Sequence, residues 1–501
     1  MKRIATRQEM QAIDAYSIHE IGIPGMVLME KASMALCEEV MARFDHHSRC
    51  LIVVEKGNNG GDGLALGRLL AEKDYLVDIY EIGGINNASE SYLAQKNILE
   101  KMDIPICNEL PEEEYDVIID GIFGVGLTRE VTGIQREVIS KLNHKAAYRI
   151  AIDVPSGVDA STGKVLGTAF KADLTVTFGL SKVGLLLYPG AEYAGEVVVK
   201  DIGFPKMAVD EVDPGAFTYE NGDEWRIPAR KSDSHKGTYG RVLVVAGAKN
   251  MAGAAYLSAK AAYRCGSGLV RIFTREENRV ILQTLLPEAI LTTYEGLHDG
   301  VPALSEAMDW ADVIIFGPGM GRGEITEWFL HLLRDNAKVP VVIDADGLNE
   351  ISSMENRGAD FLAGFSVPVI LTPHLLEMSR LSGSTVAEIK EERIPLAKEY
   401  AKENQVVLVL KDSRTIVTEG TDRLYMNSNG NSGMATGGSG DVLSGIIGAM
   451  LAAGMKPLDA AAMAVYLHGR SGDEAARELG KRSMLAGNLV DYLPCALSRQ
   501  E

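Results

Sequence analysis

Two series of short apolar runs alternate with helical segments along this chain of 501 residues. Near-continuous apolar runs separated by helices are typical of parallel sheets that are covered on both faces. The first series consists of residues 51–54, 76–80, 116–120, 148–153 and 173–178, and the second of residues 241–247, 268–274, 312–319, 340–346, 367–373 and 406–411. The pattern predicts an α/β fold built on two successive parallel sheets.

The segment between the two series differs in composition. Residues 204–230 are rich in proline, glycine and charged residues and show no sustained periodicity. The chain is also too long for one ordinary domain, and its halves share no sequence repeat. We therefore expect two different α/β domains, at residues 1–220 and 221–501.

Composition excludes several classes of protein. The formal net charge of −19 argues against nucleic acid as a partner, because phosphate backbones require a basic surface. The five cysteines are scattered and never form a C-x-x-C pair, which is typical of reduced thiols and gives no zinc site. No apolar signal segment follows Met1, and the apolar run 442–455 is too short to span a bilayer. We expect a cytoplasmic protein with small-molecule substrates and no membrane or nucleic-acid partner.

A glycine-rich loop follows the first apolar run. Residues 57–63 read GNNGGDG, and such glycines allow the backbone to approach a ligand closely. The helix that follows would offer free N–H groups and the positive end of its dipole to an anion. The loop is neither a Walker A motif nor a plain G-x-G-x-x-G, so glycine spacing alone is equally consistent with a tight strand–helix turn.

Oxygen-bearing side chains follow two later strands. Asp120 ends one apolar run, and Asp153, Ser156 and Asp159 follow the next. Because ligands in open α/β sheets bind beyond the carboxyl ends of the strands, these oxygens suit a hard cation or a ribose–phosphate group. Helix caps and Asx turns are the alternative interpretation.

Four motifs together carry a resemblance to a known family. GNNGGDGL, DGIFGVGLTRE, DVPSGVDASTG and GEVVVKDIGFP occur in this order within residues 1–215, which resemble the NAD(P)H-hydrate epimerases, also called the YjeF N-terminal domain. The family has a Rossmann-like three-layer α/β sandwich and interconverts the R and S forms of hydrated NADH or NADPH. The resemblance implies that Asp153 transfers a proton at the hydrate carbon and that Asn59, Asp120 and Ser156 bind K⁺. It further implies substrate binding by Asn58, Asn59, Gly60, Gly61, Asp62, Gly124, Val125, Gly126, Leu127, Thr128, Arg129, Glu130 and Asp153.

One departure from the family pattern precedes the glycine loop. Family members have an earlier glycine, whereas this chain has Glu55 and Lys56. A carboxylate there would repel a pyrophosphate, and Lys56 would offset that repulsion.

A second glycine-rich loop carries a single charge. In the stretch NSNGNSGMATGGSGDVLSGIIGAM, residues 427–450, Asp441 stands where glycine-rich loop becomes apolar helix. An aspartate there could be an N-cap, which contributes ~1 kcal/mol. Alternatively, the loop N–H groups could bind a phosphate and leave Asp441 to act as a base in phosphoryl transfer.

Residues 225–501 are similar to the NAD(P)H-hydrate dehydratases of the ribokinase-like superfamily. The motifs that carry this resemblance are FGPGMGRG, DADGLN, LTPHLLEMSRL and the stretch 427–450. The resemblance implies a ribokinase-like α/β domain that uses ADP with Mg²⁺, with Asp441 as the base. It implies that Ala254, Gly321, His374 and Asp441 contact the hydrated dinucleotide, that Lys411, Asp412, Ser413, Arg414, Thr415 and Gly440 contact the nucleotide, and that Asn431 and Thr436 support the loop.

Two differences and one alternative accompany this resemblance. The family often has Pro-Gly where this chain has Leu375-Leu376, and Lys-Gly where it has Lys411-Asp412. The carboxylate of Asp412 would need Mg²⁺ or a turn away from the phosphates. The alternative function is a small-alcohol kinase on the same fold with a non-catalytic N-terminal binding module. Because related domains form homo-oligomers, we also expect a homo-oligomer.

Overall fold

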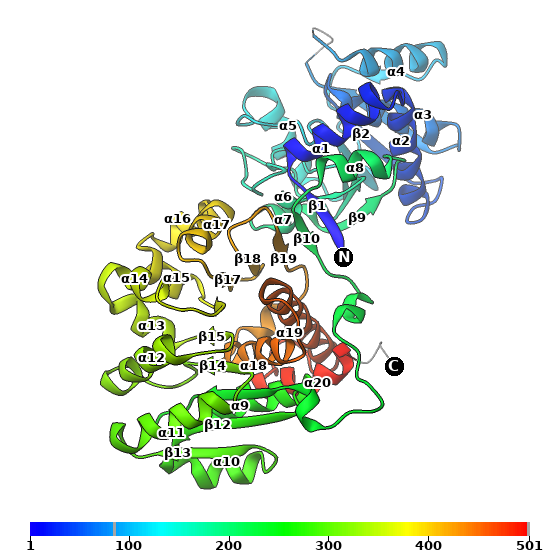
Figure 1. Ribbon diagram of the computed structural model, residues 1–501. Helices are drawn as coiled ribbons and strands as arrows, with labels where there is room; N and C mark the ends of the chain where they lie inside the picture. Colours follow the sequence, from blue (N-terminus) through cyan, green and yellow to red (C-terminus); the bar gives the residue numbers. More distant parts are fainter. Residues whose placement is uncertain (84–86, 498–501) are drawn as a thin grey trace. The chain divides into compact units, whose positions relative to one another are not determined.

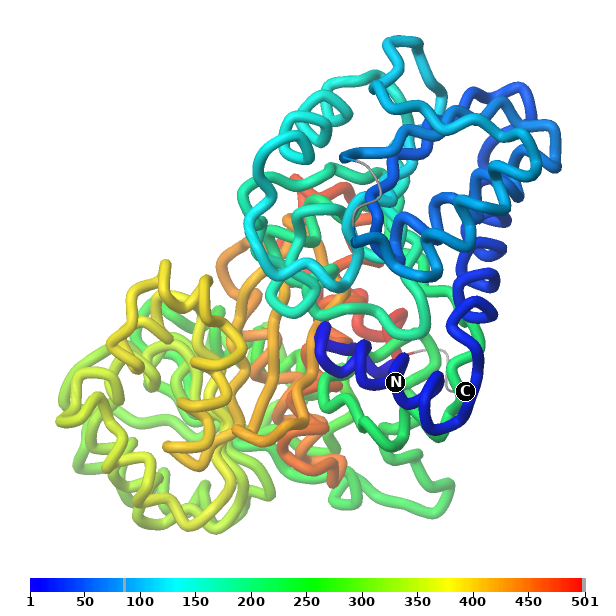
Figure 2. The backbone as a smooth tube through the Cα atoms, turned by 90° about the horizontal axis from the view of Figure 1, so that it is seen from above, coloured from blue at the N-terminus to red at the C-terminus, as the bar shows by residue number. Residues whose placement is uncertain are grey.

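The computed structural model describes residues 1–83 and 87–497, and the chain divides into two compact units (Figures 1 and 2). The first unit comprises Lys2–Ala216, and the second comprises Phe217 onward together with Met1. Residues 498–501 of the expected second domain lie outside the described residues.

The first unit is built on a seven-stranded sheet with the order β4-β3-β2-β5-β6-β7-β9. All neighbouring strands in this sheet run parallel, as the apolar runs predict. The strands are β2 (Arg49–Val54), β3 (Leu76–Glu81), β4 (Ile106–Cys107), β5 (Val117–Gly121), β6 (Tyr148–Ile152), β7 (Leu174–Phe178) and β9 (Glu196–Lys200).

Helices cover both faces of this sheet and make three layers. Alternate residues of β2 point to opposite faces, as the strand periodicity of two requires. Ile52 packs with α2 (Gly25–Met41), α3 (Asn58–Ala71) and α4 (Glu90–Lys101), whereas Val53 packs with α5 (Gly133–His144). The remaining elements are β1 (Lys2–Ala5), α1 (Arg7–Ala15), β8 (Ser181–Lys182), α6 (Val183–Leu186), α7 (Gly190–Ala194), α8 (Lys206–Val212) and a π-helical turn (Tyr16–Glu20).

The second unit contains a nine-stranded run with the order β13-β12-β11-β14-β15-β16-β17-β18-β19. The strands are β11 (Arg241–Val245), β12 (Leu269–Arg275), β13 (Ile290–Tyr294), β14 (Val313–Phe316), β15 (Val341–Ile343), β16 (Val369–Leu371), β17 (Val407–Leu410), β18 (Ile416–Thr418) and β19 (Leu424–Met426). The expectation of a purely parallel sheet is wrong here, because β17, β18 and β19 pair antiparallel. Their connections are too short for a crossover, which a parallel pair would need.

Helices also pack on both faces of the second sheet. On one side, α9 (Ala252–Arg264), α18 (Ser439–Ala452), α19 (Pro457–Leu479) and α20 (Ala486–Leu497) share a core with Val244 and Ile315. On the other side, Phe329 of α12 (Glu324–Asn336) packs edge-on against Phe273, with ring centroids 5.3 Å apart. The other helices are α10 (Arg279–Leu285), α11 (Leu297–Trp310), α13 (Asp346–Ser353), α14 (Ala359–Leu362), α15 (Leu375–Ser382), α16 (Val386–Glu391) and α17 (Arg393–Glu403). Over the described residues, no helix is both long and apolar enough to cross a membrane.

Candidate active sites

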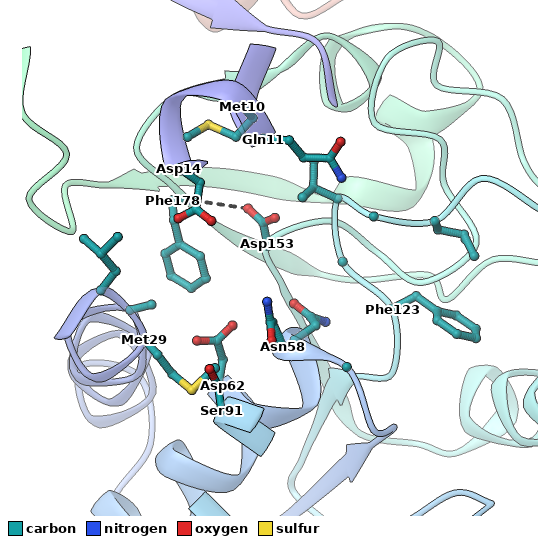
Figure 3. Close-up of a pocket in the computed structure, with 18 of the residues that line it drawn as sticks. Met10, Gln11, Asp14, Met29, Asn58, Asp62, Ser91, Phe123, Asp153 and Phe178 are labelled. Carbon is teal, nitrogen blue, oxygen red and sulfur yellow. Dashed lines mark hydrogen bonds between the residues drawn. The ribbon is translucent and has the colours of Figure 1, made fainter. Parts of the chain in front are cut away.

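A pocket of about 740 Å³ opens in the first unit, where the loops that follow β2 and β5 meet (Figure 3). Of the predicted substrate-binding residues, those that line it are Asn58, Asn59, Asp62, Gly124, Val125, Gly126, Leu127, Thr128, Arg129 and Asp153. Gly60, Gly61 and Glu130 do not line it. A Cβ on Gly60 would stand 1.7 Å from the Glu55 carbonyl oxygen, so this glycine lets α3 approach the end of β2.

The first turn of α3 faces this pocket. Its N-cap is Gly57, and no side chain caps the helix. Gly57, Asn58 and Asn59 all line the pocket. Uncapped N–H groups at the positive end of a helix form an anion site, so the pocket can hold a negatively charged ligand there.

Asp153 is held from one side by a buried lysine. The Nζ of Lys182 lies 2.6 Å from Asp153 Oδ1, and the Lys182 side chain is only 1% exposed. Thr177 Oγ1 donates to the same oxygen at 3.0 Å. No described residue hydrogen-bonds to Oδ2, so that oxygen is available to a ligand. The sequence did not indicate Lys182, which approaches Asp153 from 29 positions away in the chain.

Two further carboxyl groups share the pocket with Asp153. Asp14 and Asp62 both line it, and Figure 3 shows all three around the same space. Burial raises the pKa of Asp62 well above its usual value, and the charges of Asp153 and Asp14 add to that effect. The site therefore contains an acid that tends to stay protonated, Asp62, beside one that is paired with a cation, Asp153. No sequence pattern indicated Asp14.

The predicted K⁺ ligands gather around the loop after β5. Ser156 Oγ donates to Asp120 Oδ1 at 2.6 Å, and it accepts a bond from the Phe123 N–H at 2.8 Å. A Cβ on Gly124 would stand 2.7 Å from Asn59 Oδ1. The amide oxygen of Asn59 therefore also lies against the loop after β5. Burial raises the pKa of Asp120 to about 6, and Asn59 Nδ2 is buried without a partner among the described residues. Amide, hydroxyl and carboxylate oxygens in a buried place fit a hard cation.

Other polar residues in these loops have local roles. Asp159 Oδ1 accepts from the N–H groups of Ser161 and Thr162, so the Asx-turn interpretation describes it. Glu55 lines the pocket, and burial raises the pKa of its carboxyl, while Lys56 and Arg129 act in the opposite direction. The positive charge of Lys56 thus offsets the Glu55 carboxylate, as predicted, and Arg129 adds to that effect.

In the second unit, Asp441 lies in the first turn of α18. The N-cap is Gly438, at φ +91°, and no side chain makes a capping bond. The interpretation of Asp441 as an N-cap is therefore wrong. Burial raises the pKa of its carboxyl to about 7, and the charges of Asp344 and Asp346 contribute, while Lys411 opposes the rise. A carboxyl that titrates near neutral pH can act as a general base.

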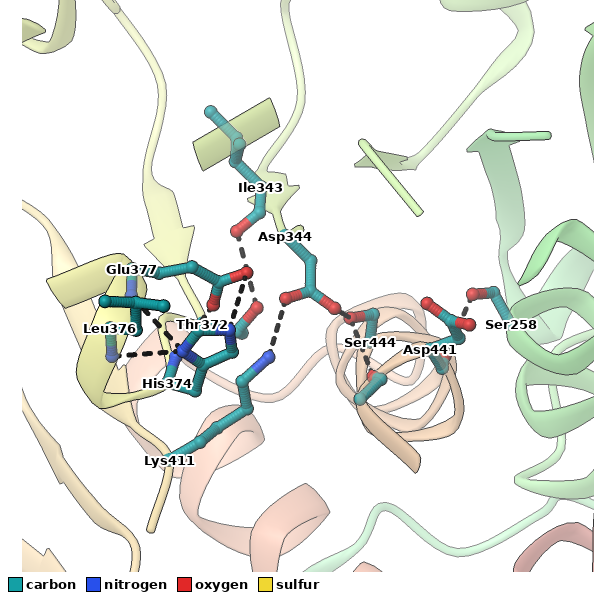
Figure 4. A network of polar contacts seen from close by, with 11 residues as sticks. Ser258, Ile343, Asp344, Thr372, His374, Leu376, Glu377, Lys411, Asp441 and Ser444 are labelled. Carbon is teal, nitrogen blue, oxygen red and sulfur yellow. Dashed lines mark hydrogen bonds and ion pairs between the residues drawn. The ribbon is translucent and has the colours of Figure 1, made fainter. Parts of the chain in front are cut away.

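Lys411 belongs to a buried polar network beside this helix (Figure 4). Its Nζ lies 2.8 Å from Asp344 Oδ1, and Ser444 Oγ donates to Asp344 Oδ2 at 2.6 Å. A Cβ on Gly440 would stand 3.2 Å from Lys411 Nζ, so the ammonium lies against the first turn of α18. Helix N–H groups and an ammonium at one place favour a phosphate.

His374 caps α15. Its Nδ1 accepts from the backbone N–H of Leu376 at 3.1 Å and of Glu377 at 3.2 Å. Burial lowers the pKa of the imidazole, and the charge of Lys411 adds to this effect, so the ring stays neutral as an acceptor must. Half of the side chain remains exposed, and its Nε2 lies 3.5 Å from Glu377 Oε1.

The segment 411–415, which contains the predicted nucleotide contacts, connects β17 to β18. Asp412 turns to Arg393, with Nη2 and Oδ2 2.6 Å apart, so its carboxylate has a cationic partner without a metal. Thr415 Oγ1 donates a hydrogen bond to the Asp412 carbonyl oxygen at 3.1 Å, and Arg414 Nη1 donates to the Ser428 carbonyl oxygen at 3.0 Å. Ser413 is exposed.

The remaining predicted residues lie in neighbouring loops of the second unit. Ala254 is buried in α9, 2.9 Å from the Cβ position of Gly319. Gly321, at φ +74°, donates its N–H to Asp346 Oδ2 at 2.8 Å. The side chain of Asn431 accepts from the Gly433 N–H and caps the short helix Ser432–Met434.

Comparisons with known proteins match both halves. A family model described as the N-terminus of YjeF-related proteins matches residues 25–184, and one described as NAD(P)H-hydrate dehydratase matches residues 242–495. The chain is 37% identical to the bifunctional NAD(P)H-hydrate repair enzyme of Moorella thermoacetica, over 99% of this chain and 97% of that protein. It is 33% identical to the enzyme of the same name from Escherichia coli, over 97% and 91%. A ribokinase-like superfamily protein from Enterococcus faecalis matches 57% of this chain and 96% of its own, with 28% identity and a TM-score of 0.51.

Proposed function

The chain belongs to the family of bifunctional NAD(P)H-hydrate repair enzymes, and from this we propose that its two units carry out the two reactions of that repair. Residues 1–220 interconvert the R and S epimers of hydrated NADH and NADPH. Residues 221–501 dehydrate the S epimer to NADH or NADPH at the expense of ADP, which gives AMP and phosphate. The observation that carries this proposal is the match over nearly the full length of both chains, with a pocket or anion loop in each half.

In the epimerase site, we assign proton transfer to Asp153. Lys182 and Thr177 occupy Oδ1, so Oδ2 is the oxygen that can take the proton of the hydroxyl on the hydrate carbon. A carbonyl would form there as the bond from that carbon to the ring nitrogen breaks, and closure of this bond on the opposite face, with return of the proton to the oxygen, would give the other epimer. The anionic part of the dinucleotide would lie at the uncapped start of α3. The pocket-lining members of the predicted set, from Asn58 to Arg129, would contact the rest of the substrate.

We further propose that Asn59, Asp120 and Ser156 hold K⁺ beside this pocket. Their oxygens fit the ion, and the buried Asp120 carboxyl lacks a cationic partner among the described residues. A bound K⁺ would supply positive charge next to the substrate and fix the loop after β5. Replacing K⁺ with the larger tetramethylammonium ion should slow epimerisation and leave dehydration unchanged.

In the dehydratase site, Asp441 acts as the base of a phosphoryl transfer. Asp441 takes the proton of the hydrate hydroxyl while that oxygen attacks the terminal phosphorus of ADP, and the bond from this phosphorus to its bridging oxygen breaks to release AMP. Phosphate then leaves with the electrons of the carbon–oxygen bond, and loss of a proton from the neighbouring carbon forms the ring double bond. Phosphorylation helps because phosphate is a far better leaving group than hydroxide.

The nucleotide and its ion belong to the same site. Lys411 and the Gly440 N–H would bind the phosphates, with Asp412, Ser413, Arg414 and Thr415 forming the adjacent loop. Mg²⁺ would enter with ADP and supply charge neutralisation between its phosphates. Ala254, Gly321 and His374 would contact the hydrated dinucleotide. We also propose that the enzyme works in the cytoplasm as a homo-oligomer, on small-molecule substrates alone.

One assay tests both reactions. The absorbance of reduced nicotinamide, which the hydrates lack, is followed with mixed R and S hydrates, Mg²⁺, K⁺ and ADP. We expect the absorbance to recover beyond the amount that the S hydrate alone can supply, at a rate faster than spontaneous epimerisation. If the absorbance stops rising when the S hydrate is consumed, the first unit has no epimerase activity and is a non-catalytic binding module. No recovery with ADP or ATP would overturn the repair function and favour a small-alcohol kinase.

A further inference from the structure

We propose that Asp344 is a positioning residue for phosphoryl transfer, which holds the Lys411 ammonium at the first turn of α18 where the phosphate of the nucleotide binds. The inference rests on the dehydratase reaction proposed above and adds to it a residue that touches neither substrate. Asp344 directly follows β15, and Lys411 directly follows β17, so the sheet itself brings both to one edge.

The contacts of Asp344 leave its carboxylate little freedom. The side chain is 1% exposed, and its two oxygens serve different partners. Oδ1 meets Lys411 Nζ at 2.8 Å, and Oδ2 accepts from Ser444 Oγ at 2.6 Å. Ser444 lies one turn after Gly440 in α18, so the carboxylate links the ammonium to the helix whose N-terminus forms the anion site.

The geometry at Gly440 shows where this link acts. Its Cβ position is 3.2 Å from Lys411 Nζ and 3.6 Å from Asp344 Oδ2. The ammonium therefore lies beside the backbone that would bind a phosphate, and a side chain at residue 440 would displace it. Positional errors near 1 Å in such a site can slow a reaction about a hundredfold.

Charge explains why an anchor is needed. The positive end of α18 repels an ammonium, and burial alone would lower the pKa of Lys411. The pKa of Lys411 is nevertheless raised, because the charges of Asp344 and Glu377 outweigh the effect of burial. Asp344 thus keeps Lys411 charged and in place before the nucleotide arrives.

Asp344 also affects the base. The charged groups that act on Asp441 are Asp344 after β15, Lys411 after β17 and Asp346 in α13. Asp344 raises the proton affinity of Asp441, and Lys411 lowers it. Removing the charge of Asp344 should therefore weaken Asp441 as a base, both directly and because the charge of Lys411 is no longer balanced.

The test compares Asp344→Asn, Ser444→Ala and Lys411→Gln in the full-length protein. We expect Asp344→Asn to lower the kcat of ADP-dependent dehydration about a hundredfold, and to move the acid limb of the kcat/KM profile to lower pH. Ser444→Ala should change both in the same direction by a smaller factor. In the Lys411→Gln background, Asp344→Asn should lower kcat by a much smaller factor than it does alone, because the positioning effect of Asp344 acts through Lys411 and only its direct effect on Asp441 remains. A merely structural ion pair would not shift the pH profile.

Two internal controls separate the possible failures. Epimerisation by the same variants reports on the first unit, and a thermal unfolding curve reports on folding of the second unit, which carries the substitutions. Asp312→Asn is a matched variant in the second unit, because it changes an aspartate that accepts from the Arg241 N–H at the other end of the sheet. If the unmodified enzyme shows no ADP-dependent dehydration, the proposed function fails rather than this inference. If Asp344→Asn retains kcat and its pH profile within twofold, the inference is overturned. If that variant does not fold, an unchanged Ser444→Ala variant overturns it instead.

Discussion

The Asp441 carboxyl must lose its proton before it can accept one from a substrate hydroxyl. Because burial and the charge of Asp344 raise its pKa to about 7, dehydration should rise with pH through neutrality and level off above it. Asp441→Asn should abolish dehydration and retain nucleotide binding, since it removes the base and keeps the helix terminus. A pH–rate profile and a nucleotide titration check both, and retained turnover would exclude Asp441 as the base.

The same raised pKa has a consequence for stability. An acid whose pKa is higher in the folded than in the unfolded state loses stability as pH rises through the folded value. Asp441→Asn should therefore raise the Tm of the second unit at pH values above about 7, where the native protein carries this charge in a buried place. Calorimetry at two pH values tests this, and a lower Tm for the variant above neutrality would contradict it.

The pair of Lys182 and Asp153 permits a different experiment at the residue scale. Lys182→Met leaves Asp153 without its cation, and breaking a buried pair in this way costs about 3–5 kcal/mol. The double variant that also carries Asp153→Asn should recover much of this loss, because no uncompensated charge remains. Urea unfolding of the single and double variants measures the coupling, and additive losses would show that the pair does not interact.

The pairs Lys182–Asp153 and Asp344–Lys411 also show why the sequence did not predict every residue of each site. Asp153, Asp441 and the glycine loops carry local patterns, so the sequence indicates them directly. Lys182 and Asp344 instead meet their partners from 29 and 67 positions away. No local pattern marks Lys182. Asp344 begins the DADGLN motif, but the motif does not indicate that its partner is Lys411, since such a pairing depends on which strands become neighbours.

Among the elements, the predicted parallel strands are the buried ones. Their residues are apolar on both faces, which gives a continuous signal, as in β2 and β11. The strands that the sequence did not predict include β9 and β13, which lie at sheet edges and are only half-buried. The hairpin strands β18 and β19 have three residues each, too few for any periodicity. Edge and hairpin strands therefore depend on pairing rather than on their own composition.

The loop before α18 offers a prediction at the element scale. Gly438 is at φ +91°, and a Cβ there would stand 2.5 Å from Leu257 Cδ1. Gly438→Ala should lower the free energy of unfolding by about 1–3 kcal/mol and weaken nucleotide binding. Gly437 is the matched control, because its Cβ position has no neighbour within 4 Å. If Gly438→Ala and Gly437→Ala have equal Tm values, the strained backbone at residue 438 does not explain why a glycine is needed there.

For the whole molecule, the two sites lie in separate compact units of one chain. The sequence predicts this division because residues 204–230 lack the alternation seen on either side. Each unit has its own core, so each reaction can be removed without removing the other. A substrate in the R form must nevertheless pass through the first site before the second can use it.

This order predicts complementation between two inactive variants. The Asp153→Asn protein alone should convert only the S hydrate of a mixture to reduced dinucleotide, and the Asp441→Asn protein alone should convert neither hydrate. A mixture of the two proteins should restore the full signal, because the epimers are small molecules that diffuse from one chain to another. The recovery rate should rise with the concentration of Asp441→Asn protein until dehydration becomes limiting. If the mixture also stops at the S fraction, transfer occurs only within one chain, and the two sites do not work as independent catalysts.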